Sequence, residues 1–451
     1  MNYEEAREYI KTLYDEKRII LGLERVQRLM SLVGDSHNNY PCAIVTGTNG
    51  KGSTSTYLTA ILKACGLKVG TNLSPHVQEI TERFEIDLQQ INHEQFAKLT
   101  TVFKEVIQTK WPAGIERPTF HEMMTAMAFH LFGEEKVNFA VMEVGMGGRY
   151  DACNIACNKL SIFTPIHYDH CRYLGDSLEA IALEKGQIMK AGGVAVSAPQ
   201  PPKVKKVLQE IADKFGTHLE FLDLKRFSHL EANLLEPVRF KYKFSETVED
   251  DICLAIKGNY QVHNAALAIL AAEKLSELDI VPNLSKSLNS ETIRKGLSEV
   301  QSKHLPARFE LVGMNPALII DGGHNVHGIR GFVTEIKKQN PGGKVTLVMG
   351  FKDGKNYFDV LPYIDSFFSR VIFTNFETNG GVQPSVLKTE LDKLSSKFRV
   401  KPEILTIDDP IEALDTALKN VEDNTRDLVA VAGSLYLAGE VKNRMKRPEE
   451  K

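Results

Sequence analysis

Several features that would assign the chain to a broad class are missing from its 451 residues. The charges nearly balance, with a formal net charge of −3, which excludes the strongly basic surface of a nucleic-acid-coating protein. No hydrophobic run is long enough to cross a bilayer, and the charged N-terminal stretch is unlike a signal peptide. Repeats and low-complexity tracts are also absent. We therefore expect a cytoplasmic, monomeric, globular protein with small-molecule ligands and no nucleic-acid or membrane partner.

Cysteine is scarce and scattered. The six cysteines form no CxxC pair, which favours reduced thiols of a structural or incidental kind over a disulfide frame or a zinc site. They are Cys42, Cys65, Cys153, Cys157, Cys171 and Cys253.

What is present is an alternation of apolar, β-rich runs with helical patterns, which is typical of parallel strands joined by crossover helices. The length exceeds what one core supports, so we expect two domains, residues 1–300 and 301–451. The expected strands of the first are 42–46, 138–144, 160–164 and 193–197, followed by an irregular β excursion over 218–256. Those of the second, a smaller doubly wound sheet, are 317–321, 344–351, 370–376, 403–408 and 428–434.

Residues 46–54 read TGTNGKGST, between an apolar strand and a helical run. This arrangement presents successive backbone N–H groups and a helix N-terminus to an anion. Lys51 can reach terminal phosphates, and the hydroxyl of Ser53 or Thr54 can meet phosphate or Mg²⁺. The strict P-loop spacing would need a glycine in place of Val45. We predict a phosphate loop; the alternative is a turn whose glycines and asparagine serve backbone geometry and whose lysine serves solubility.

The variant GTNGKGST resembles the phosphate loop of the Mur ligases, which are ATP-dependent amide ligases, and the serine after it favours their folylpolyglutamate synthase and dihydrofolate synthase branch. Further stretches agree in the family's order over nearly the whole chain. They are GLERV (22–26), SPH with ITERFEI (74–86), MEVGMGGRYDACN (142–154), DHCRYLGDSLEAIALEKGQIMKAG (169–192), GNYQVHNAALAI (258–269), LPARFE (305–310), IIDGGHNVHG (319–328) and VAGSLYLAGEV (431–441). The resemblance implies an α/β fold with a P-loop ATP-binding domain and a smaller, Rossmann-like C-terminal domain.

The resemblance also implies the reaction. A carboxylate oxygen is a poor leaving group, so the substrate carboxylate attacks the γ-phosphate of ATP and the amine of L-glutamate then attacks the acyl phosphate. Both steps build negative charge that Mg²⁺ and cationic side chains stabilise. GLERV and GGRYDA are similar to the bifunctional bacterial enzymes, which join glutamate to dihydropteroate and also lengthen the glutamate tail of reduced folates. We expect ATP, two Mg²⁺ sites, L-glutamate and a pteroate or folate as ligands.

By the same resemblance, the site residues fall into four overlapping sets. The ATP-binding set is Thr48, Asn49, Gly50, Lys51, Gly52, Ser53, Thr54, Gln261, Asn264, Arg308, Asp321 and His324. The metal set is Ser74, Glu143, His170 and Lys185, and the catalytic set is Lys51, His170 and Lys185. The substrate set is Arg25, Arg149, Asp151 and Ala152.

Each of these assignments has a plainer alternative. Lys185, which the resemblance implies is carbamylated to hold the second Mg²⁺, could be an ordinary solvated helix lysine. His170 could be a loop histidine, and DGGHN (321–325) could be only a turn rich in Asp, Gly and Asn. Arg149 and Asp151 could serve to fix their own loop.

Three stretches depart from the family pattern. PIHYDH (165–170) introduces Pro165 and His167, TFHE (119–122) has His121 where an aromatic residue is commoner, and TNFETNGGVQP (374–384), around Gly380, lacks an arginine-alanine pair. None removes a phosphate or Mg²⁺ residue, but they affect the pterin and glutamate pockets.

Two other functions stay open at this point: a Mur-type ligase for another carboxylate, and a non-catalytic, nucleotide-binding regulatory protein. The early position of the ATP loop, at Gly47, argues against a peptidoglycan enzyme with a separate N-terminal UDP-binding domain. Retention of Glu143, His170 and Lys185 argues against the non-catalytic protein, because nucleotide binding alone does not need them.

Overall fold

The computed structural model describes residues 1–14, 20–230, 234, 236–245, 248–314, 316–340, 342–376, 380–395, 398, 400–419 and 427–446. The chain separates into two compact units. Unit 1 is Met1–Ser228, Phe240–Ile252 and His263–Val300, and unit 2 is His229–Arg239, Cys253–Val262 and Gln301–Lys451. The expected division into domains 1–300 and 301–451 stays a prediction.

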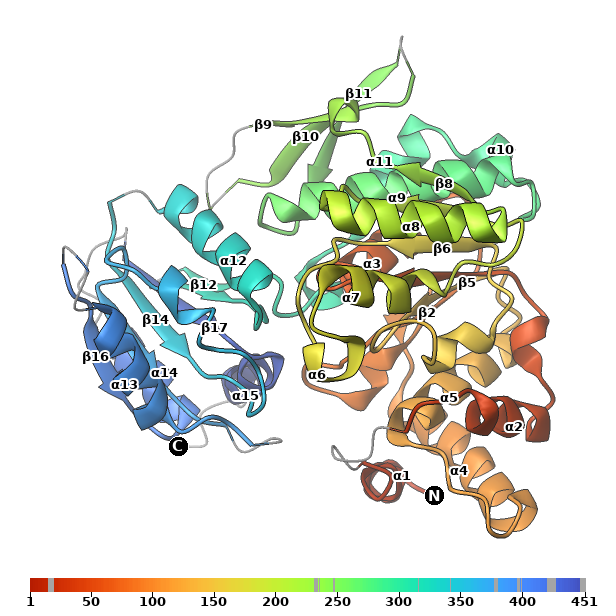
Figure 1. Cartoon of the computed structure of the whole chain (residues 1–451), viewed down its shortest axis with the longest axis horizontal. Coiled ribbons are helices and arrows are strands. Elements are labelled where there is room, and N and C mark those ends of the chain that lie inside the picture. The colour runs from red at the N-terminus through yellow and green to blue at the C-terminus, as the bar shows by residue number, and fades with distance from the viewer. Residues whose placement is uncertain are drawn as a thin grey trace. The chain divides into compact units, whose positions relative to one another are not determined.

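Unit 1 is built on an eight-stranded sheet with the order β4-β3-β2-β5-β1-β6-β7-β8 (Figure 1). The strands are β1 (Cys42–Thr46), β2 (Val69–Asn72), β3 (Phe84–Ile86), β4 (Gln89–Gln90), β5 (Phe139–Glu143), β6 (Leu160–Phe163), β7 (Val194–Ser197) and β8 (His218–Phe221). The neighbouring strands β2, β5, β1, β6, β7 and β8 pair in parallel. Beyond β2, the strands β3 and β4 extend the sheet with antiparallel pairing. The four strands expected for this sheet are confirmed. The excursion expected over 218–256 is wrong in one respect, because its first strand, β8, pairs with β7 in the main sheet.

Helices cover both faces of this sheet. Their bounds are α1 (Tyr3–Lys11), α2 (Glu24–Leu32), α3 (Lys51–Ala64), α4 (His93–Lys110), α5 (Phe120–Glu134), α6 (Cys171–Leu174), α7 (Leu178–Gly186), α8 (Pro202–Phe215), α9 (Tyr260–Glu277), α10 (Leu284–Ser287) and α11 (Ser290–Glu299). Alternate residues of β1 point to opposite faces, so Cys42 and Ile44 join the core formed with α4 and α5. The other face of the sheet carries α3, which packs on β1, β2 and β5 and against α11.

Unit 2 holds a six-stranded sheet with the order β12-β13-β17-β14-β15-β16 (Figure 1). Its strands are β12 (Glu310–Met314), β13 (Ala317–Ile320), β14 (Val345–Met349), β15 (Arg370–Phe373), β16 (Glu403–Thr406) and β17 (Leu428–Ala432), and its helices are α12 (Val326–Gln339), α13 (Pro384–Ser395), α14 (Pro410–Lys419) and α15 (Leu435–Lys446). All pairs are parallel except β12 with β13. The five expected strands are therefore confirmed, and β12 is an added antiparallel edge.

A third, small sheet has the order β11-β10-β9, with β9 (Phe227–Leu230), β10 (Val238–Lys243) and β11 (Glu249–Leu254). Within the described ranges, no helix is long and apolar enough to cross a membrane.

Candidate active site

The predicted phosphate loop connects β1 to α3 in unit 1. Gly50, immediately before the helix, has a φ of 90°, and a Cβ at this position would lie 2.4 Å from Oδ1 of Asn264 on α9. The backbone N–H of Thr48 donates to the carbonyl of Pro165 over 2.8 Å, and its hydroxyl donates to the carbonyl of His167 over 2.9 Å. Pro165 and His167, which depart from the family pattern, therefore hold Thr48 of the loop through their backbone carbonyls. A residue of any type could supply such a carbonyl.

The first turn of α3 supplies the polar groups that a phosphate would meet. Thr54 is fully buried, and its Oγ1 has no hydrogen-bond partner among the described residues. Lys51 Nζ donates over 3.3 Å to the backbone carbonyl of Thr48, so its positive charge stays close to the loop. An anion-binding turn with a buried hydroxyl still to be satisfied fits a nucleotide phosphate.

Gly47, at the start of the loop, has no room for a side chain. Its φ is 147°, and an added Cβ would lie 1.9 Å from Oγ1 and 2.8 Å from the carbonyl oxygen of Thr164. We expect Gly47→Ala to lower the free energy of unfolding by about 3 kcal/mol, because strain in the backbone adds to a clash with Thr164 just beyond the end of β6. Chemical denaturation of both proteins measures this difference.

Gly66 provides the matched control for that substitution. It also has a left-handed φ, 89°, but an added Cβ would meet nothing within 4 Å. Gly66→Ala should therefore lose only the conformational term of about 1 kcal/mol. Equal losses in the two variants would show that Thr164 does not confine the loop.

Lys185 lies against the same loop. It is on α7, only 4% exposed, and its Nζ donates over 2.7 Å to the backbone carbonyl of Gly47. Burial, together with the charge of Lys51, lowers the pKa of Lys185 to about 7, although Asp169 and Asp151 act in the opposite direction. The alternative of a solvated helix lysine is therefore wrong.

Glu143 ends β5 and lies beside the first turn of α3. An added Cβ at Gly52 would lie 3.4 Å from Glu143 Oε2, and that oxygen accepts a 2.9 Å hydrogen bond from the backbone N–H of Ser74. Glu143 is 4% exposed. The structure thus brings together two members of the predicted metal set, one carboxylate and one serine, whose oxygens suit Mg²⁺.

His170 is placed differently from the other predicted metal residues. It adopts a left-handed conformation with a φ of 52° before α6, and its side chain is 40% exposed. Its Nε2 lies 3.9 Å from Asp169 Oδ1, beyond hydrogen-bond distance, while its backbone N–H donates to that oxygen over 2.8 Å. Among the residues that the structure describes, no three His, Cys, Asp or Glu side chains form a metal-binding group. The role of His170 as a metal ligand stays a prediction.

The predicted substrate residues are held by partners within unit 1. Arg25 pairs with Glu122 on α5, with Nη2 2.7 Å from Oε1 and Nε 3.1 Å from Oε2, and both side chains are buried. Arg149 pairs with Glu184, its Nη1 lying 3.4 Å from Oε1. Their place in substrate binding remains a prediction.

Asp151 begins the short η3 helix (Ala152–Ile155), whose first residue, Ala152, is buried. The Asp151 carboxylate accepts from the backbone N–H groups of Gly145, Met146 and Cys153. Asp151 therefore fixes the loop that follows Glu143, and a part for Asp151 or Ala152 in substrate binding stays a prediction.

In unit 2, Asp321 organises the turn after β13. It is 6% exposed and accepts hydrogen bonds from the hydroxyl of Tyr260 over 2.9 Å, from the backbone N–H of Phe309 over 2.8 Å and from that of Gly323 over 2.7 Å. His324 Nδ1 lies 2.9 Å from the carbonyl of Gly322. DGGHN is thus a turn fixed by its own aspartate, which leaves its nucleotide role a prediction. Gln261, the fourth member of the ATP set in unit 2, is fully buried on α9.

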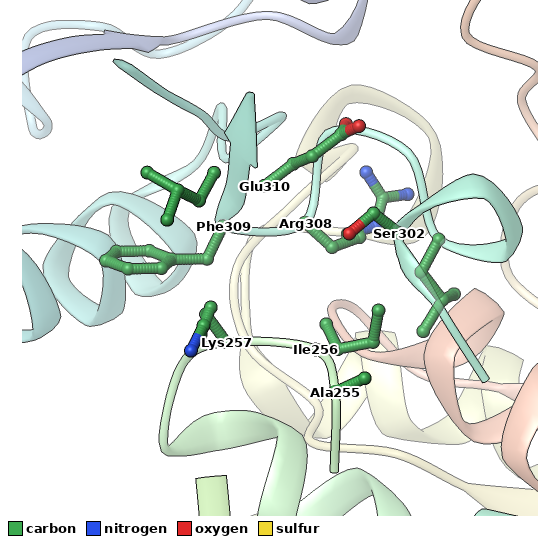
Figure 2. Close-up of a pocket in the computed structure, with 9 residues that line it drawn as sticks. Ala255, Ile256, Lys257, Ser302, Arg308, Phe309 and Glu310 are labelled. Carbon is green, nitrogen blue, oxygen red and sulfur yellow. The ribbon is translucent and has the colours of Figure 1, made fainter. Parts of the chain in front are cut away.

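A pocket of about 140 Å³ lies beside Arg308 in unit 2 (Figure 2). Figure 2 shows Lys257 on one side of this pocket and Arg308 with Ser302 on the other. Glu310, on the rim, is paired with Lys442 at 2.6 Å. The remaining lining residues are Ala255, Ile256, Leu305, Phe309 and Leu311.

Two supporting residues escaped the sequence-based prediction. Glu82 accepts hydrogen bonds from the backbone N–H groups of Val77, Gln78 and Glu79, and so fixes the segment that follows Ser74. The motif ITERFEI contained this glutamate, but only the geometry reveals its task. Tyr260, the partner of Asp321, lies in the GNYQ stretch and carried no recognisable signal.

Within the stretch 374–384, which departs from the family pattern, residues 377–379 lie outside the described residues. The structure therefore does not describe this departure in full. The flanking Gly380 has a left-handed φ of 73°.

The chain is similar to known proteins over almost its whole length. Residues 45–272 match the Mur ligase middle domain and residues 307–435 the Mur ligase, glutamate ligase domain. A dihydrofolate synthase/folylpolyglutamate synthase of Bacillus subtilis is 29% identical, covering 94% of this chain and 95% of the relative. A dihydrofolate synthase/folylpolyglutamate synthase of Mycobacterium tuberculosis is 30% identical, covering 94% of this chain and 87% of the relative. The crystal structure of M. tuberculosis folylpolyglutamate synthase complexed with ADP and AMPPCP aligns with a TM-score of 0.84 at 27% identity, covering 99% and 100%.

Proposed function

The chain belongs to the Mur ligase family, in its folylpolyglutamate synthase and dihydrofolate synthase branch, and on that premise we propose that it ligates L-glutamate to dihydropteroate, to the glutamate tail of reduced folates, or to both. It is an ATP-dependent acid–amino-acid ligase. The observation that carries the proposal is the cluster around the phosphate loop, in which Lys185 contacts Gly47 and Glu143 faces Gly52. A phosphate loop that only bound a nucleotide would need neither the buried lysine Lys185 nor the carboxylate of Glu143 beside it.

The residues of unit 1 suggest how the first step proceeds. The loop N–H groups and Lys51 hold the terminal phosphates of ATP, so that negative charge developing on the transferred phosphoryl group meets fixed positive charge. Glu143 and Ser74, with a hydroxyl of the first turn of α3, would hold Mg²⁺, which when bound would neutralise phosphate charge. The substrate carboxylate attacks the γ-phosphorus, ADP leaves, and the acyl phosphate becomes the electrophile for the glutamate amine. Inorganic phosphate is released as the amide forms.

Carbamylation of Lys185 would complete the metal site. As an ammonium, Lys185 donates a hydrogen bond to Gly47 and has no lone pair for a cation, and as a neutral amine it offers only a nitrogen where Mg²⁺ prefers oxygen. Because its pKa is lowered to about 7, a large fraction of the side chain is neutral at physiological pH and can attack CO₂, losing one proton to give a carbamate anion. That anion would supply oxygen ligands for a second Mg²⁺.

Dependence of ADP release on both substrates tests the proposed function. Purified protein is supplied with ATP, Mg²⁺ and either dihydropteroate or tetrahydrofolate, with L-glutamate present or omitted. We expect ADP release to require the acid and the glutamate together, because the acyl phosphate turns over only when an amine consumes it. ADP formed at the same rate without either substrate would instead indicate the nucleotide-binding regulatory protein.

A further inference from the structure

The segment 74–83 joins β2 to β3 and carries Ser74, one of the predicted metal residues. The backbone N–H of Ser74 donates over 2.9 Å to Oε2 of Glu143, so this segment is tied to the strand end that carries the predicted metal-binding carboxylate. Groups that orient the ligands of a metal without touching it affect metal binding nearly as much as the ligands do. The contacts that fix this segment therefore bear on the Mg²⁺ site.

The carboxylate of Glu82 binds three successive backbone N–H groups of this segment. Its Oε2 accepts from Val77 over 2.6 Å, and its Oε1 accepts from Gln78 over 2.8 Å and from Glu79 over 2.9 Å. Hydrogen bonds from N–H groups to an ionised carboxylate are roughly twice as strong as those between neutral groups. A single side chain thus fixes the stretch of backbone that comes shortly after Ser74.

The next residue, Arg83, holds the chain on both sides of Ser74. Its backbone carbonyl accepts from Asn72 Nδ2 over 2.9 Å and from the N–H of Leu73 over 3.2 Å, and both of these residues precede Ser74. Its Nε donates over 2.9 Å to Nδ1 of His76, which follows Ser74. Because Arg83 is buried, these bonds form away from bulk water. Ser74 is therefore bracketed by contacts to one buried arginine.

The demands of the metal give this fixing a consequence for binding. Mg²⁺ requires a near-ideal octahedron of ligands at about 2.0–2.1 Å. A ligand that is displaced by about 1 Å is enough to spoil a site of this kind. Ser74 lies on the connection between two strands, so no regular secondary structure holds its hydroxyl in place. The bonds made by Glu82 and Arg83 take over that task.

We propose that Glu82 is a positioning residue of the Mg²⁺ site: by fixing the backbone after Ser74, it keeps the Ser74 N–H on Glu143 and the Ser74 hydroxyl in reach of the metal. The bond between Arg83 and His76 supports the same arrangement from the other end of the segment. This inference rests on the proposed function, in which Ser74 and Glu143 hold Mg²⁺ for ATP, and adds a residue that acts on the metal only through Ser74.

The test compares wild-type protein with Glu82→Gln. Glutamine keeps the size of the side chain but replaces one oxygen with an NH₂ group, which cannot accept from a backbone N–H. Mn²⁺ serves as the probe, and its binding to the protein with a non-hydrolysable ATP analogue is measured by water-proton relaxation, without turnover. We expect the Kd for Mn²⁺ to rise about 10-fold or more, as when a partner of a metal ligand is removed. The Mg²⁺ concentration that half-saturates ADP release should rise by a similar factor, while kcat at saturating Mg²⁺ stays near that of wild type.

Glu105→Gln is the matched control, because Glu105 is an exposed glutamate on α4, and this variant should bind Mn²⁺ as wild type does. A wild-type Kd for Mn²⁺ in Glu82→Gln would overturn the inference, since a residue that only stabilises the fold changes the melting temperature and leaves the metal affinity unchanged.

If Glu82→Gln does not fold, His76→Leu takes its place, because it removes only the acceptor of the Arg83 bond. Loss of one hydrogen bond should raise the Kd for Mn²⁺ about 3-fold to 10-fold. His76→Asn keeps an acceptor oxygen near the position of Nδ1 and should restore binding, whereas a wild-type Kd in His76→Leu overturns the inference.

Failure of the proposed function would be a separate result. If wild type binds Mn²⁺ with the nucleotide analogue but ligates glutamate to neither acid, the proposed function is wrong, and the comparison of Mn²⁺ binding still decides the role of Glu82. If wild type ligates glutamate but Glu82→Gln binds Mn²⁺ normally, only the inference is wrong.

Discussion

Replacement of Lys51 by methionine is expected to lower kcat/KM for glutamate-dependent ADP release by about 10²–10³-fold, the range seen when a preorganised donor to a developing anion is removed. Lys51 opens α3, and its ammonium is bonded only to the Thr48 carbonyl, at 3.3 Å, among the described contacts. Methionine keeps the length of the side chain and removes the charge. The effect should appear in chemistry and ATP binding, while the melting temperature stays close to that of wild type.

Lys63→Met is the matched control, because Lys63 lies on the same helix and is paired with Glu299 at 2.9 Å, with both side chains about one-third exposed. Partly exposed ion pairs of this kind contribute about 0–1 kcal/mol to stability, so this variant should retain wild-type activity. Equal losses of activity in the two variants would point to damage to α3 and not to loss of a phosphate contact.

Lys185→Ala is expected to abolish most ligase activity, with a loss of about 10²–10³-fold, and formate or acetate should restore part of it. The substitution opens a space beside the Gly47 carbonyl that a small carboxylate can fill, supplying the anionic oxygens of the proposed carbamate. Lys185→Arg separates the two possible roles, because arginine keeps a positive charge but cannot form a carbamate. We expect the arginine variant to be as inactive as the alanine variant and not to respond to formate.

Carbamylation of Lys185 would also give a carbamate signal when wild-type protein is supplied with ¹³C-bicarbonate and observed by NMR, and we expect no such signal in Lys185→Ala. An alanine variant that retains wild-type activity, combined with no carbamate signal in wild type, would contradict the modification. Retention of activity in Lys185→Arg would show instead that the site needs a cation at this position.

Most strands of both sheets could be predicted because they are short, apolar runs between turn signals, as in Cys42–Thr46 and Leu428–Ala432. The inner strand β2, whose four residues include a glycine and an asparagine, was missed, as were β3 and β4 at one edge of the larger sheet and β12 at one edge of the smaller. β8 is polar at His218 and Glu220 and only half-buried, so its pattern resembles that of an isolated ribbon, and its pairing with β7 comes from the fold. β12 is likewise an edge strand, paired on one side only.

The candidate site shows the same division between local and long-range information. The residues of the predicted phosphate loop are contiguous in the sequence, so the strand, the glycines and the lysine could be recognised together as one motif. By contrast, the burial of Lys185 and its contact with Gly47 join residues separated by 138 positions, and a lysine on a helix carries no mark of burial. The partners of Arg25 and Arg149, which are Glu122 and Glu184, are likewise set by tertiary packing. Motifs thus predict the candidate residues, and packing decides which of their side chains are already paired within the protein.

The proposed ligation is tested most directly by incorporation of labelled L-glutamate, with ATP and Mg²⁺, into dihydropteroate and tetrahydrofolate in parallel reactions. We expect an amide-linked, labelled product from at least one of the two acids, formed together with ADP and phosphate, and absent in Lys51→Met. Both products would identify a bifunctional enzyme, and one alone would identify the branch. If active, ATP-binding protein labels neither acid, the family assignment stands but the folate substrate is wrong.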